Sequence, residues 1–379
     1  LTGSGLAWKV ACYMLTLVDD YDYAMELVDL AAFGTIADVA PLIGENRSIV
    51  KRALRQMRSC WYKREGVKAL YDGPLDRITA EDIAFKIAPC INASGRLDVR
   101  GADLPLLLLL EDRPGIAEFL AERLTDCNNR RKSIQKEWCN RMEETALKMI
   151  EQGDKVLVLL ADGAPSGVVG LVAGNLKEKY NRPTIVFAPK QDSSGKTVWT
   201  GSGRSIKGFH LLNALKTCED FFLAYGGHEL AAGMSIPENE EVLSQLRTRL
   251  NQVAEYLSET DLMPMTYWDT EITEAELTNS LYEELKSLEP FGEGVKKPVF
   301  KMRMHLLPKR HMLMGADKSH LKLFCENYSA VGFSLADKYI RSELPEVIDA
   351  LGYPCENYFN GKVKQEFMLV DFEPVTENE

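Results

Sequence analysis

The chain has 379 residues, 45% of them hydrophobic and 27% charged, with eight cysteines and a net charge of −11. This length predicts two or three domains of a soluble globular protein. The acidic net charge argues against nucleic-acid binding through bulk electrostatics. No apolar run reaches the ~18 residues of a membrane span. The cysteines are scattered and form no C-x-x-C pair, which indicates a reducing cytoplasm.

Residues 1–52 are predicted to form a helix and then a buried strand over "LVDLAAFGTIADVAPL" (27–42). Strands of an α/β sheet deliver functional side chains at their carboxyl ends, which makes Asp38 a candidate metal ligand. The alternative is an aspartate that caps the following helix. The chain begins at Leu1 inside a helical pattern, so we expect the natural N-terminus to be missing.

A basic segment, "RSIVKRALRQMRSCWYKR" (47–64), contains seven cations and no acidic residue. Its cations recur at helical spacing opposite an apolar stripe that ends at Trp61. This helix is either a solvated face or a surface for phosphates or a negatively charged partner domain.

Residues 53–152 are predicted to be a helical connector, with a stretch punctuated by Gly and Pro at 87–105. Within it, apolar residues keep helical register from 114 to 151 without Gly or Pro after the first turn. Such a helix would be roughly 50 Å long and is typical of a strut joining two domains.

Residues 153–260 alternate between strand and helix patterns, which predicts a mixed or parallel sheet covered by helices. The expected strands are 155–161, 182–188, 196–206 and 231–236, and the expected helices are 167–180, 209–218 and 240–257. Residues 264–379 instead read as short strands with a helix near 334–342, which favours a small β-barrel of oligonucleotide-binding (OB) type. Its aromatic residues, Phe300, Phe324, Phe333 and Phe359, either form the core or stack bases.

Four segments in order resemble one family: "GTIADVAPLIGENR" (34–47), "INASGRLD" (91–98), "GSGRSIKGFHLLNAL" (201–215) and "YGGHELAAG" (225–233). Together with "LEPFGEGVKKPVF" (288–300) they are similar to the RecJ-type single-stranded-DNA-specific exonucleases of the DHH phosphoesterase superfamily. The G-G-H-x-x-A-A-G pattern marks the DHH-associated domain generally, whereas the long connector and the terminal barrel favour the RecJ type.

The resemblance implies an α/β protein made of four parts. These are the C-terminal part of a DHH catalytic domain (1–52), the connector (53–152), the DHH-associated domain (153–260) and an OB-like barrel (264–379). The family's upstream H-x-D-x-D-G and D-H-H motifs are absent from this sequence. We therefore expect a chain that lacks the first half of the catalytic domain, and that is inactive alone.

The family hydrolyses phosphodiesters with two divalent cations, Mn²⁺ or Mg²⁺, for which carboxylates are the preferred ligands. Asp38 matches the family's downstream metal-binding aspartate. A single carboxylate cannot hold two metals, so most of that site is expected outside this chain.

"GSGRS" (201–205) brings a hydroxyl, exposed amides and a guanidinium together, and arginine can hold two phosphate oxygens at once. The resemblance implies that Ser202 and Arg204 grip a 5′-terminal phosphate. It also makes Arg96 a phosphate ligand, with Asn92 orienting the same loop. A polar turn with a surface arginine is the structural alternative.

His228 lies between Gly226, Gly227 and "AAG", among small residues that leave room for close approach. A lone histidine is more often a packed core residue than a ligand. The resemblance places His228 near the scissile or terminal phosphate, as a catalytic-site hydrogen-bond donor to phosphate rather than a general base.

The function implied is 5′-to-3′ exonuclease action on single-stranded DNA in DNA repair and recombination. The partners implied are single-stranded DNA, a single-strand-binding protein and a helicase, with no membrane and a monomeric state. Two alternatives stay open: a non-catalytic nucleic-acid-binding scaffold, and a phosphodiesterase acting on short oligonucleotides or cyclic dinucleotides.

Overall fold

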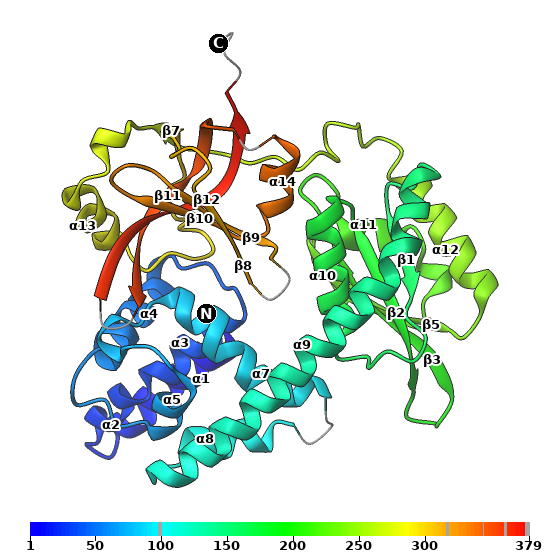
Figure 1. The fold of residues 1–379 in the computed structure, drawn as a ribbon. Coiled ribbons are helices and arrows are strands. Elements are labelled where there is room, and N and C mark those ends of the chain that lie inside the picture. The colour runs from blue at the N-terminus through cyan, green and yellow to red at the C-terminus, as the bar shows by residue number, and fades with distance from the viewer. Residues whose placement is uncertain (98–100, 316–317, 344, 360–361, 376–379) are drawn as a thin grey trace. The chain divides into compact units, whose positions relative to one another are not determined.

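The computed structural model describes residues 1–97, 101–315, 318–343, 345–359 and 362–375 (Figure 1). The chain divides into two compact units. The first comprises Leu1–Gln56, Thr79–Glu81 and Met265–Glu379, and the second comprises Met57–Ile78 and Asp82–Pro264. Within the described ranges, none of the helices combines the length and hydropathy needed to cross a bilayer.

The first unit begins with four helices: α1 (Gly3–Thr16), α2 (Tyr21–Glu26), α3 (Val28–Ala37) and α4 (Gly44–Met57). The strand predicted over 27–42 is wrong, because its central part forms α3 and Asp38 is the C-cap of that helix. Helix α3 is buried on nearly all sides. A run that is apolar throughout has no periodicity from which to separate a buried helix from a buried strand.

The basic segment is helical only as far as Met57. The prediction that Trp61 continues the apolar stripe is wrong, since this side chain is 82% exposed. Inside α4 the expected stripe holds, with Val50, Leu54 and Met57 buried.

Helix α4 and the loop before it are hydrogen-bonded to the segment between residues 287 and 300, directly before β7. The Arg47 guanidinium donates to the carbonyl oxygens of Pro290 (2.7 Å) and Leu288 (2.5 Å). The amide of Leu42 donates to the carbonyl oxygen of Glu293 (2.7 Å). Arg47 therefore serves this packing and is not part of a solvated basic face.

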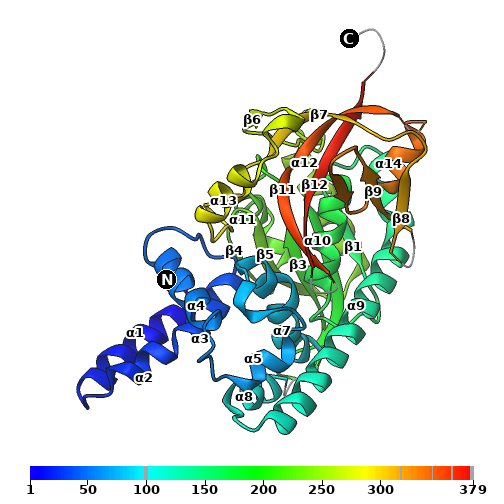
Figure 2. The same cartoon turned by 60° about the vertical axis from the view of Figure 1, so that its left-hand side comes forward.

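In the described part of the chain, the barrel of the first unit is a seven-stranded sheet in the order β6-β7-β11-β12-β10-β9-β8. Figure 2 shows the two long strands β11 and β12 paired along their length. The elements are β6 (Thr270–Glu271), β7 (Phe300–His305), β8 (His311–Met314), β9 (His320–Phe324), β10 (Ser329–Gly332), β11 (Val347–Phe359) and β12 (Lys362–Pro374), with α13 (Asn279–Ser287), α14 (Ala336–Arg341) and a 3-10 turn Glu274–Glu276.

Alternate side chains of these strands form one apolar core that includes Met302, Leu323 and Phe367. Of the aromatics considered as base-stacking candidates, Phe300 lies in that core and Phe333 is 59% exposed. The side chain of Phe359 lies outside those described.

One carboxylate is buried within this barrel. Glu366 of β12 is 2% exposed and accepts hydrogen bonds from Lys322 Nζ (2.5 Å), Ser329 Oγ (3.0 Å) and Asn357 Nδ2 (2.9 Å). Its partners come from β9, β10 and β11, so this one side chain joins four strands.

The connector helices follow, and apart from Ala80 and Glu81 they lie in the second unit; α9 is the longest of them. Their bounds are α5 (Glu65–Leu70), 3-10 Leu75–Arg77, α6 (Ala80–Asp82), π-helix Ile83–Ile87, α7 (Ala88–Leu97), α8 (Asp103–Leu110) and α9 (Pro114–Glu151). Helix α9 is the long helix expected from the amphipathic pattern, with proline at its first turn, where no backbone N–H is needed. Its inward face packs first on Cys90 and Leu108, and further along on the sheet of this unit through Trp138 and Met149.

That sheet has the order β1-β2-β3-β5-β4 among the described residues. Only β1 and β2 are parallel, and the other pairings are antiparallel. Helices α9 and α10 share a core with one face, and α11 and α12 with the other. The short edge strand β4 was not predicted. The elements are β1 (Leu157–Leu160), α10 (Val169–Tyr180), β2 (Thr184–Gln191), β3 (Thr197–Arg204), α11 (Leu211–Lys216), 3-10 Glu219–Phe221, β4 (Ala224–Gly227), β5 (Ala231–Pro237) and α12 (Glu240–Val253).

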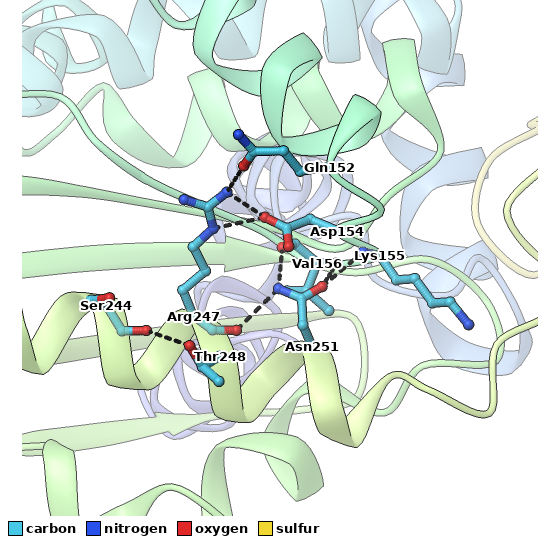
Figure 3. Close-up of polar contacts among 8 residues, drawn as sticks. All are labelled: Gln152, Asp154, Lys155, Val156, Ser244, Arg247, Thr248 and Asn251. Carbon is cyan, nitrogen blue, oxygen red and sulfur yellow. Dashed lines mark hydrogen bonds and ion pairs between the residues drawn. The ribbon is translucent and has the colours of Figure 1, made fainter.

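Helix α12 is joined to the start of β1 by a polar network (Figure 3). Asn251 Oδ1 accepts from the amides of Lys155 (2.7 Å) and Val156 (3.0 Å), and its Nδ2 donates to the Val156 carbonyl (3.1 Å). Arg247 pairs with Asp154 at 2.5 Å in the same network. Asn251 thus supplies hydrogen-bond partners for the backbone groups of the two residues before β1, Lys155 and Val156.

Candidate phosphate-binding site

Ser202 and Arg204 lie at the end of β3, in the middle of the sheet. Arg204 Nη1 donates to Ser202 Oγ (3.0 Å) and to the carbonyl oxygen of Gly203 (2.8 Å). Alternation along a strand puts residues two apart on the same face, so the hydroxyl and the guanidinium are neighbours. The sequence segment "GSGR" therefore forms the end of the strand expected over 196–206.

The first turn of α10 faces this pair, which the sequence reading missed. A Cβ atom on Gly170 would lie 2.8 Å from Ser202 Oγ and 3.2 Å from Arg204 Nη2, so a larger residue there would displace the serine hydroxyl. Val168, the N-cap of α10, makes no side-chain cap hydrogen bond. The first N–H groups of a helix have no intrahelical partners and favour anions. The signal available in the sequence was the spacing of glycines in "SGVVG" (166–170) after a buried strand.

Arg96 reaches the same place from α7. Its Nη1 donates to the carbonyl oxygen of Gly167 (3.3 Å), directly before α10. The expectation that Asn92 and Arg96 share a loop is wrong, because both lie in α7. Asn92 is exposed and one turn before Arg96, on the same face of the helix.

Arg96 and Arg204 are two cations whose surroundings disfavour their charge. Burial lowers the pKa of the Arg96 guanidinium, and burial together with the charge of Arg96 lowers the pKa of Arg204. Both side chains are half-buried, and neither belongs to an ion pair among the described residues. Two adjacent cations without a carboxylate partner are stabilised when an anion binds between them.

His228 follows the edge strand β4 and is exposed, so the reading of a packed core histidine is wrong. Its Nδ1 accepts from the amide of Leu230 (3.3 Å), and its own amide donates to the Ala231 carbonyl (2.8 Å). Leu230 in turn accepts from the amide of Ser205, the residue after Arg204 (2.9 Å). The turn that contains His228 and Leu230 is thereby hydrogen-bonded to the residue that follows β3.

A row of small residues crosses the sheet here, since Gly226 pairs with Gly233 and Gly233 pairs with Ser202. Both glycines are exposed, and a Cβ on either would meet nothing within 4 Å. Packing therefore does not require glycine at 226 or 233. Gly227 differs, because its φ of +151° and a Cβ position 2.4 Å from the Ala231 carbonyl oxygen require glycine for the backbone itself.

Asp38 is an exposed residue of the first unit, whereas all the phosphate-site candidates lie in the second. In the described ranges, no three His, Cys, Asp or Glu side chains are grouped so that they could hold a metal ion. One exposed carboxylate cannot by itself complete a Mn²⁺ or Mg²⁺ centre, which takes several oxygen ligands. The structure thus brings together Ser202, Arg204 and Arg96, and the residues present do not form the metal site.

Comparison with known proteins finds a matching family for each of two segments that follow helix α9. Residues 153–256 match the family described as the DHHA1 domain, and residues 268–371 match the RecJ OB domain.

The "Single-stranded-DNA-specific exonuclease RecJ" of Bacillus subtilis is 33% identical over 98% of this chain and 46% of its own length. The protein of the same description from Escherichia coli is 33% identical over 86% of this chain and 58% of its own. The crystal structure of RecJ from Thermus thermophilus in complex with Mn²⁺ has a TM-score of 0.72 at 31% identity, covering 93% of this chain and 50% of that one. The crystal structure of the same Thermus thermophilus protein in complex with Mg²⁺ has a TM-score of 0.73. The chain spans about half the length of the curated relatives it matches.

Proposed function

This chain belongs to the RecJ family of single-stranded-DNA-specific exonucleases, and on that premise we propose that its second unit binds the 5′-terminal phosphate of single-stranded DNA for 5′-to-3′ exonucleolysis. The observation that carries the proposal is the half-buried Arg96–Arg204 pair beside Ser202 and the first turn of α10, with no carboxylate partner among the described residues.

The chemistry follows from these groups. Arg204 and Arg96 would neutralise the phosphate, with Ser202 and the α10 amides as hydrogen-bond donors. The open row Gly226–Gly233 would let the first nucleotides lie close to the backbone, with His228 donating to a phosphate oxygen. A terminal monoester carries up to two negative charges, whereas a chain phosphate carries one, so this site would favour the 5′-phosphorylated end.

A direct test is binding in EDTA, so that no hydrolysis occurs, of 5′-phosphorylated and 5′-hydroxyl oligothymidylate of equal length. We expect tighter binding of the phosphorylated strand, and a loss of about tenfold or more in that preference for Arg204→Gln, since a charge-assisted contact is removed. Equal affinity of the wild-type chain for the two strands would refute the 5′-phosphate role.

For hydrolysis, we propose Asp38 as this chain's single ligand to the Mn²⁺ or Mg²⁺ centre of a two-metal enzyme. The other ligands would come from beyond the described residues, and these residues alone would bind DNA without cutting it. In an assembly that cuts DNA, Asp38→Asn should abolish Mn²⁺-dependent cleavage and leave 5′-phosphate binding unchanged. Cleavage at the wild-type rate would remove Asp38 from the metal site.

We extend the proposal to the partners. Single-stranded DNA would lie along the barrel, and a single-strand-binding protein and a helicase would act on the same strand. The chain itself would be a monomer in the cytoplasm. Sedimentation of the chain with and without oligothymidylate checks the monomer, and a dimer in both samples would contradict it.

A further inference from the structure

A third arginine, Arg131, lies on the inward face of α9. That face packs on α7 through Ala121 and Leu124, and further along on the α10 side of the sheet through Trp138. Arg131 falls between these two apolar contacts. Figure 1 shows α7 and α10 both lying along α9. This is also the region where Arg96, near the end of α7, contacts Gly167 before α10.

Neutral groups hold the guanidinium of Arg131. Its Nη1 donates to Gln135 Oε1 (2.8 Å) and its Nη2 donates to Asn128 Oδ1. Asn128 is 5% exposed and donates to Cys90 Sγ of α7 (3.3 Å), which fixes it. Arginine has five N–H donors, so three stay available after these two bonds.

Within the described ranges, no carboxylate neutralises the charge of Arg131. Amide oxygens orient a guanidinium without neutralising it, unlike a carboxylate. Burial and the nearby positive charge of Arg96 both lower the pKa of Arg131. Arg131 belongs to no ion pair among the described residues. Arg96 is therefore the common neighbour of two half-buried cations, Arg131 on α9 and Arg204 on β3.

We propose that Arg131 completes a three-arginine site with Arg96 and Arg204, and that it determines the preference for a terminal phosphate monoester over a 5′-hydroxyl end. This inference rests on the proposed function. Two cations suffice for the single charge of a chain phosphate, and the third matches the second charge that only a monoester carries.

The helix supplies a matched control. Arg130 is exposed on α9, next to Arg131 in sequence but not on the inward face. Arg130→Gln and Arg131→Gln change the net charge equally, so long-range attraction of DNA falls equally in both. Only Arg131→Gln removes charge from the proposed site.

The experiment measures, in EDTA, the ratio of the dissociation constants for 5′-hydroxyl and 5′-phosphorylated oligothymidylate. We expect Arg131→Gln to lower this ratio by about tenfold, the loss typical of one charge-assisted contact, and Arg130→Gln to leave it unchanged. Arg131→Gln also removes the hydrogen bonds to Asn128 and Gln135 that support the packing of α9 on α7, so Gln135→Glu provides a second variant. It places a carboxylate of nearly the same shape against Arg131 and should also lower the ratio.

A wild-type ratio retained by both Arg131→Gln and Gln135→Glu overturns the inference. If Arg204→Gln abolishes the preference in the same series, the proposed function stands and only the role of Arg131 falls. A wild-type chain without any preference refutes the proposed function itself.

Discussion

The two adjacent glycines of β4, Gly226 and Gly227, differ in how strongly the backbone requires glycine. At Gly227 the backbone has a positive φ and a Cβ would collide with the Ala231 carbonyl oxygen. At Gly226 the space where a Cβ would lie is empty and exposed. The backbone conformation thus requires glycine at position 227, whereas packing does not require it at position 226.

The two substitutions should therefore separate stability from binding. Gly227→Ala is expected to cost about 1–3 kcal/mol in the free energy of unfolding, because it forces a strained backbone. Gly226→Ala should change that free energy by less than about 0.5 kcal/mol and weaken binding of 5′-phosphorylated oligothymidylate. Urea unfolding and anisotropy measure the two quantities. Unchanged binding by Gly226→Ala would show that no ligand approaches this strand.

Individual residues could be predicted where their neighbours in sequence reveal the chemistry. Ser202 and Arg204 share a short glycine-rich segment, which made them candidates for binding phosphate, but only the family resemblance favoured that role over a polar turn. Arg131 could not, since Arg130 and Lys132 are equally basic and only the packing of α9 distinguishes them. Exposure of His228 likewise depends on β4 being an edge strand.

Secondary-structure elements were predictable where periodicity or length was strong. Helix α9 and the sheet β1-β2-β3-β5 follow the patterns seen in the sequence. Helix α3 was misread as a strand because burial on all sides removes the amphipathic pattern that identifies a helix. Strand β4 was missed because two of its four residues are glycine, which is rare in strands.

The barrel strands are joined by Glu366, which gives the barrel a defined pH response. Burial by itself raises the pKa of the Glu366 carboxyl, but hydrogen bonds from Lys322, Asn357 and Ser329 outweigh it and hold that pKa below its ordinary value. A depressed folded-state pKa stabilises the fold above the unfolded pKa of about 4.3 and loses that effect as pH falls through the folded pKa.

Glu366→Gln should thus lower the free energy of unfolding by about 2–4 kcal/mol at neutral pH, because Lys322 loses its buried partner. The gap between wild type and variant should shrink below about pH 4, where the wild-type carboxyl becomes protonated. Urea unfolding across this range measures the gap. The exposed Glu326→Gln is the control, and a gap independent of pH would contradict the assignment.

At the scale of the whole molecule, the chain has two compact units, each with its own apolar core. Separate cores predict separate unfolding transitions, since cooperative two-state behaviour belongs to single domains.

Calorimetry should therefore resolve two transitions that respond to different substitutions. Glu366→Gln is expected to lower the first unit's transition. Asn251→Ala should lower the second unit's by about 1–3 kcal/mol in stability, because two amides before β1 lose their acceptor. A single transition shifted by both variants would show that the units unfold together.

The contact of Arg47 with Pro290 joins residues 243 positions apart in the chain. The ribosome adds roughly 5–20 residues per second, so Arg47 is made about 12–50 seconds before its acceptor. All of the second unit is synthesised in that interval and can fold first. The first unit can complete its packing only after that interval, because the contact between α4 and the loop before β7 requires Pro290.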